Sequence, residues 1–124
     1  MFIASWRGTS ESRAKAEEVF FDDSRILIAS SIIRLELAPH SGNRPEEIAH
    51  FQSLFEFIHL WVSMDDALVG RAREIRTAFD VASIDALHLA AAELAVTDQF
   101  ITTERPGKPL YRVSHLGPVF LSNL

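Results

Sequence analysis

Three acidic residues, Glu36, Asp85 and Glu104, occupy positions from which carboxylates can form a site for a divalent cation. Asp85 lies in the first turn of 81–94, an Ala- and Leu-rich stretch that we predict to be a buried helix. Glu104 follows 99–102, which we predict to be a short strand. Ligands in open α/β sheets bind at the carboxyl ends of strands, and oxygen ligands suit Mg²⁺ or Mn²⁺. These acids therefore indicate metal-assisted hydrolysis, in which the metal lowers the pKa of a bound water and stabilises charge on phosphate.

Two of these acids also have purely structural explanations. Asp85 can interact with the dipole of its helix, with Ser83 as the cap. Glu36 lies beside apolar residues, so its carboxylate needs a partner, and an ion pair with Arg34 or Arg112 would satisfy it as well as a cation would. The sequence leaves both pairs of alternatives open.

Glu104 and His88 likewise have both a functional and a structural explanation. Glu104 would be an ordinary residue of a surface turn before Pro106. His88 comes three residues after Asp85 on the same side of the predicted helix, so the two could ligate one metal. A single histidine on an apolar helix is more often a packing residue.

The sequence contains no nucleophilic triad, nucleophile elbow, Walker motif, Gly-rich fingerprint or His-Glu-x-x-His motif. Hydrolysis by acid-bound metal is the one catalytic chemistry with candidate residues.

The composition favours one folded domain, residues 1–124, because 48% of the residues are hydrophobic and only 23% are charged. The net charge of −5 gives no overall positive field for nucleic acid, although a local basic patch can still serve. The absence of cysteine excludes disulfides, thiolate zinc sites and cysteine nucleophiles. No apolar run reaches the roughly 18 residues of a membrane span, and we expect a cytoplasmic protein.

The predicted elements alternate between strands and helices. Residues 2–6 form a short apolar run that fits either a strand or a helix. We predict strands at 25–29, 59–62, 99–102 and 111–113, and helices at 10–21, 32–38, 45–57, 66–79 and 81–94. Alternation of this kind is typical of an α/β fold with a parallel sheet.

Four stretches resemble the PIN domain family, the fold of the VapC-type toxin ribonucleases. Residues 84–92, Ile-Asp-Ala-Leu-His-Leu-Ala-Ala-Ala, resemble the helix that carries the third acid of that family. Residues 100–104, Phe-Ile-Thr-Thr-Glu, are similar to its strand ending in Thr-x-Asp. Residues 29–37 resemble its second-acid helix, and 2–8 resemble the run that follows its first-acid strand. The four stretches occur in the family's order and cover nearly the whole chain.

The resemblance implies a three-layer α/β/α fold with a short parallel sheet and a truncated or absent first strand. It implies that Glu36, Asp85 and Glu104 are the catalytic, metal-binding acids, with Glu104 in the place usually held by Asp. Thr102 and Thr103 would be supporting polar groups. The family's first acid has no counterpart in residues 1–8, and the first strand, which is central in that fold, is not recognisable. We therefore expect weak metal binding and low activity for this chain, or a true start further upstream.

The function implied by the resemblance is that of a Mg²⁺- or Mn²⁺-dependent endoribonuclease, the toxin of a toxin–antitoxin pair. Its substrate would be RNA and its protein partner an antitoxin. Arg71, Lys108 and Arg112 are candidates for phosphate contacts, since RNA affinity is mostly backbone electrostatics. Arg73 and Arg76 fit a solvated helix face better.

The alternative function is a PIN-like module that lacks catalysis and binds an antitoxin-like peptide or a second copy of itself. The aromatic residues of the predicted helix 45–57, such as Phe51, Phe55 and Phe57, suit a homodimer or a helix-in-groove contact. They would equally well fill the core.

Overall fold

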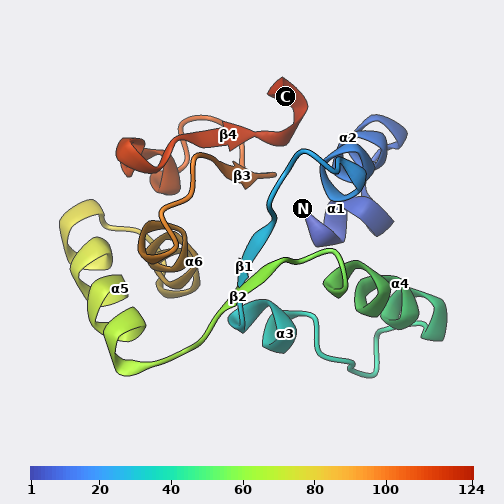
Figure 1. The fold of residues 1–124 in the computed structure, drawn as a ribbon, viewed down its shortest axis with the longest axis horizontal. Helices are drawn as coiled ribbons and strands as arrows, with labels where there is room; N and C mark the ends of the chain where they lie inside the picture. The colour runs from blue at the N-terminus through green and yellow to red at the C-terminus, as the bar shows by residue number, and fades with distance from the viewer.

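The structure is a computed structural model that describes all 124 residues, and its strands are only three residues long (Figure 1). The helices are α1 (Phe2–Arg7), α2 (Ser10–Phe21), α3 (Ile32–Glu36), α4 (Pro45–Phe55), α5 (Asp66–Phe79) and α6 (Ser83–Leu94). The strands are β1 (Ile28–Ser30), β2 (Leu60–Val62), β3 (Phe100–Thr102) and β4 (Pro118–Phe120). Three 3₁₀ turns complete the chain, η1 (Pro109–Arg112), η2 (Ser114–Leu116) and η3 (Leu121–Asn123).

The strands form two separate parallel pairs rather than one sheet. β1 pairs with β2, with Ile28 opposite Leu60, and β3 pairs with β4, with Phe100 opposite Pro118. The mixed α/β class and the parallel pairing are confirmed. The single short sheet expected from the sequence is present only as two pieces, and the three-layer arrangement stays a prediction.

Two hydrophobic clusters hold the chain together. One lies among α5, α6, η1 and η2, and the other among α1, α2 and α4 with Leu27 and Leu121. Figure 1 shows the helices of the two clusters on opposite sides, with β1 between them. On α5 the apolar residues Leu68, Ala72 and Ile75 are buried, because residues spaced three or four apart share one helix face. The alanines of α6 let the two helices approach closely.

The aromatic residues of α4 divide between the core and the surface. Phe51 is buried, and Phe55 is half-buried with its ring centroid 5.5 Å from that of Phe2. Phe57 lies beyond the end of α4, exposed, and forms an edge-to-face pair with exposed Phe21. Core filling therefore accounts for the first two aromatics but not for Phe57.

The predicted strand at 111–113 is wrong. The chain forms the 3₁₀ turn η1 there, and the last strand is β4. Pro109 at the first position fixes a helical φ, and the three-residue spacing of Leu110 and Val113 buries both on one side of such a turn. The apolar run at the N-terminus is the helix α1, so the strand alternative for it is also wrong.

The other predicted elements exist with shifted ends. β1 begins three residues later than predicted, and α3 and α4 each end two residues earlier than predicted. Helix α5 begins and ends as predicted, and the Asp65 carboxylate caps it, since Oδ1 accepts a hydrogen bond from the Leu68 amide at 2.8 Å.

Removal of this cap gives a first testable prediction. We expect Asp65→Ala to lower the free energy of unfolding by about 1 kcal/mol, because the first-turn amide loses its acceptor. Urea denaturation measures the change. Asp65→Ser should restore most of the loss, and Asp66→Ala, one residue along, should cost less. An equal loss in the Asp65→Ala and Asp66→Ala variants would contradict a capping role.

Candidate functional site

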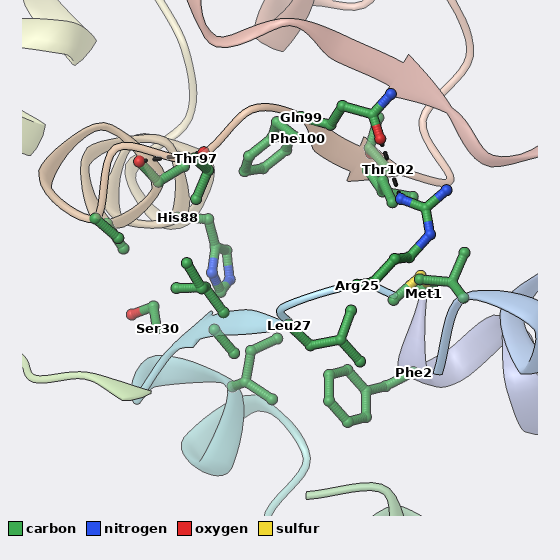
Figure 2. A pocket seen from close by; sticks show the side chains of 18 of the residues that line it. Met1, Phe2, Arg25, Leu27, Ser30, His88, Thr97, Gln99, Phe100 and Thr102 are labelled. Carbon is green, nitrogen blue, oxygen red and sulfur yellow. Dashed lines mark hydrogen bonds between the residues drawn. The ribbon is translucent and has the colours of Figure 1, made fainter. Parts of the chain in front are cut away.

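A cavity of about 1000 Å³ lies between the two sheets and contains every predicted acid. Residues of β1 and β3 line it from opposite sides, and α1, α3 and α6 contribute further walls. In Figure 2 the side chains of Phe100, His88, Leu27 and Met1 are arranged around this space. Residues from distant parts of the sequence therefore line the same cavity.

Three structural elements bring the acids to the cavity. Helix α3 follows β1 directly and carries Glu36 in its last turn. Helix α6 presents Asp85 and, one turn later, His88. Glu104 comes two residues after the end of β3. The acids thus lie beyond the carboxyl ends of two strands, which is where α/β proteins place ligands.

Glu36 is paired with His88, and neither predicted arginine partner is used. Glu36 Oε1 lies 2.5 Å from His88 Nε2, with the glutamate side chain 40% and the histidine side chain 17% exposed. Arg34 instead lies over the Trp61 ring at 3.9 Å, and Arg112 donates to the carbonyl oxygen of Phe79. The ion pair of Glu36 with either arginine is therefore wrong, and His88 is a polar partner in the cavity rather than a packing residue alone.

Asp85 is half-buried, and burial raises its pKa. The negative charge of Glu104 raises this pKa further, the nearby His88 lowers it, and Glu36 adds a smaller increase. Crowded carboxylates that repel one another hold a cation or a proton more readily than isolated ones. The predicted cap of this helix is wrong, because Ala82 occupies the cap position and Ser83 is already helical.

The threonines hold the turn that carries Glu104. Thr102 is buried, and its Oγ1 accepts a hydrogen bond from the Glu104 amide at 3.0 Å, while exposed Thr103 lines the cavity. The Tyr111 hydroxyl donates to the Glu104 carbonyl oxygen at 2.7 Å. Burial, and after it the charge of Glu104, raise the pKa of Tyr111. No local pattern singled out this tyrosine, because its hydroxyl reaches Glu104 only once the chain has turned through η1.

The donor chemistry suits Mg²⁺ or Mn²⁺, since carboxylate oxygens are hard ligands. In the arrangement observed, however, no three His, Asp or Glu side chains converge closely enough to hold an ion. Glu36 is already hydrogen-bonded to His88. A metal at this cavity therefore remains a prediction from residue type and location.

The candidate RNA contacts lie outside the cavity. Arg71 binds both Glu93 and Glu74, and its guanidinium lowers the pKa of Glu93 to about 2. Lys108 and Arg112 are exposed on and beside η1. To contact phosphate, Arg71 would have to break its hydrogen bonds to Glu74 and Glu93. Lys108 would not have to break such bonds.

Comparisons with known proteins add no family assignment. Neither a family model, nor a curated protein, nor a solved structure matches this chain. None of the helices has the length and apolar character needed to cross a membrane.

Proposed function

We propose that the chain is a metal-dependent endoribonuclease of the PIN type, acting as the toxin of a toxin–antitoxin pair in the cytoplasm. One observation carries the proposal: Glu36, Asp85 and Glu104 come from separate parts of the chain to one cavity, where burial, and after it the charges of Glu104 and Glu36, raise the pKa of Asp85. Mutual repulsion of this kind favours a bound cation.

In this proposal Glu36, Asp85 and Glu104 hold Mg²⁺ or Mn²⁺. When bound, the metal supplies an activated water and stabilises the charge on the phosphodiester. The chain itself contributes the desolvation of Asp85 and the hydrogen bond from the Glu104 amide to Thr102, which fixes the turn. Lys108 and Arg112 contact the phosphates of the RNA, and Arg71 does so when it is released from Glu93.

The first test is cleavage of a mixed structured RNA in the presence of Mn²⁺. We expect weak cleavage that is lost with EDTA and lost in Glu36→Gln, because the variant keeps the shape but not the charge of the side chain. Glu56→Gln, an exposed acid outside the cavity, is the matched control and should cleave like the parent. Cleavage that survives EDTA, or that is equal in the two variants, would contradict the proposal.

A second candidate function is a PIN-like module that binds an antitoxin-like partner or a second copy without cleaving RNA. Two observations favour it: no three ligands converge on a metal position, and Phe21 and Phe57 form an exposed aromatic pair. Light scattering tests self-association. A dimer that does not cleave RNA supports this candidate, and a monomer that binds no partner counts against it.

A further inference from the structure

The carboxyl-terminal ends of α2 and α4 meet at an exposed aromatic pair. Phe21 is the last residue of α2, and Phe57 comes two residues after the end of α4. Their ring centroids are 4.9 Å apart, although Phe21 is 54% and Phe57 is 41% exposed. Figure 1 shows both helices on the same side of β1. Phe20 and Phe55, one and two residues before them in the sequence, pack in the core, whereas this pair remains in solvent.

Two further apolar side chains border the pair. Residues 22–25 form a turn closed by a backbone hydrogen bond of 3.1 Å, which brings Ile26 back toward the end of α2. The Leu60 amide donates to the Leu27 carbonyl oxygen at 3.3 Å, so Leu60 lies next to the same segment. Ile26 and Leu60 are both exposed. We define the apolar patch as Phe21, Ile26, Phe57 and Leu60.

The charges around the apolar patch are negative. Neither α2 nor α4 has a basic residue in its last turn. A helix C-terminus is the negative end of the helix dipole, and Lys or Arg there is stabilising. Here the two C-termini are followed or preceded instead by exposed acids. These acids are Glu18, Asp22, Asp23 and Glu56.

Ion pairs within the chain involve only two of these acids. Arg25 Nε lies 3.4 Å from Asp22 Oδ2, and Lys15 Nζ lies 3.9 Å from Glu18 Oε2. Asp23 and Glu56 form no ion pair. A partner that has positive charges beside its apolar side chains would therefore complement this surface in both respects.

We propose that the apolar patch binds a short segment of a partner protein in which apolar side chains alternate with Lys or Arg. The apolar side chains of the segment cover Ile26 and Leu60. Its cations contact the exposed phenylalanine rings, through cation–π attraction, and pair with Asp23 and Glu56. They also supply the positive charge that the two helix C-termini lack. The proposal does not rest on the nuclease function, because none of these residues is assigned to RNA cleavage.

Neither a second copy of the chain nor RNA fits this surface as well. A symmetric dimer places the same patch of both subunits together, so the acids of one copy would face the acids of the other. The net charge of −5 adds to this repulsion. RNA phosphates would meet the same negative field. A basic, apolar segment of a different protein is therefore the occupant that the charges select.

The test is a titration of the ¹⁵N-labelled chain with the peptide acetyl-Arg-Leu-Ile-Arg-Arg-Leu-Ile-Arg-amide, followed by amide resonances. The resonances of residues 21–26 and 56–60 should shift. A peptide with Glu in place of Arg should bind at least about tenfold more weakly, because like charges meet. A peptide with Ser in place of Leu and Ile should also bind at least about tenfold more weakly, because it buries less apolar surface. No binding up to about 1 mM peptide would overturn the proposal.

Two matched pairs of variants place the peptide on the chain. Phe57→Ser should weaken binding at least about tenfold, because an aromatic contact is lost. Leu35→Ser should bind like the parent, since exposed Leu35 lies on α3, beyond the opposite end of β1. Glu56→Lys should weaken binding about threefold, as expected for one exposed ion pair. Glu46→Lys, the same change at the other end of α4, should have no such effect.

Other outcomes would overturn the proposal. They are equal effects of the patch and control variants, equal binding of the three peptides, or resonance shifts around Glu36, Asp85 and Glu104 in place of the patch. Shifts of the patch that appear without peptide as the protein concentration rises would assign it to a second copy and would also overturn the proposal. Glu36→Gln should bind the peptide like the parent, so the peptide result and the cleavage result can fail separately.

Discussion

Replacing Asp85 with Asn is expected to lower Mn²⁺-dependent RNA cleavage by a factor on the order of 100 or more, while the chain stays folded. Asn keeps the size of the side chain but removes the charge that would bind the cation. Single-turnover cleavage, with circular dichroism of the same samples, measures both expectations. Unchanged cleavage would show that Asp85 does not bind the metal.

The same variant reports on the electrostatics of the cavity without any RNA. Burial and the charge of Glu104 raise the pKa of Asp85 above its value in the unfolded chain. The folded protein therefore has its full stability below the unfolded pKa and loses this contribution as the pH rises through the folded pKa. Asn does not titrate, so the Asp85→Asn variant does not lose this stability as the pH rises. Near neutral pH the variant should therefore unfold at a higher urea concentration than the parent chain. The difference in stability between the two should become smaller in acid.

Urea midpoints measured from about pH 3.5 to pH 7 cover the ordinary range of aspartate titration. They test the expected difference in stability between the parent chain and Asp85→Asn. Asp66→Asn, an exposed first-turn aspartate of α5, is the control and should show no comparable gain near neutral pH. If Asp85→Asn is instead less stable than the parent at neutral pH, the favourable interaction of Asp85 with its helix outweighs its repulsion by the glutamates. The structural explanation of this residue would then be preferred.

The largest stability effect is expected from Leu121→Ala. Leu121 is 1% exposed and belongs to the cluster formed by α1, α2 and α4, although it lies in the 3₁₀ turn η3 near the end of the sequence. Its truncation removes buried methyl groups and leaves a cavity, which costs about 2–5 kcal/mol. Denaturation in urea measures the loss.

Leu35→Ala is the matched control, because the same change at an exposed leucine should cost less than about 0.5 kcal/mol. If the two variants lose the same stability, η3 does not pack as described. The hydrogen bond from Lys15 Nζ to the Leu124 carbonyl oxygen, 2.6 Å long, would then still join α2 to this segment.

Local sequence signals predicted the helices better than the strands. The periodic apolar residues of α5 and the cap at Asp65 lie within a few turns of one another, so the sequence contains the whole signal. The strands are three residues long, and their ends are set by pairing with distant segments. At 111–113, apolar residues fit a strand and a 3₁₀ turn equally well until Pro109 is given weight.

Sequence reasoning named three acids that line the cavity but not the contacts that they make, and their role as metal ligands stays a prediction. Glu36, Asp85 and Glu104 do line one cavity, as the order of elements indicated. The bond between Glu36 and His88 joins residues 52 positions apart, and no local pattern could select it over an arginine partner. The division of the sheet into two pairs also depends on long-range packing, which sequence periodicity does not report.

Leu121 packs against helices that are translated long before it, and this has a consequence for biosynthesis. Helices α1, α2 and α4 leave the ribosome early, yet the cluster they form with Leu27 is completed only by a leucine that is translated much later. The α5–α6 pair needs only neighbouring residues and can form quickly, as local contacts do. Until residue 121 emerges, the apolar face of the early helices stays accessible to chaperones and to other nascent chains.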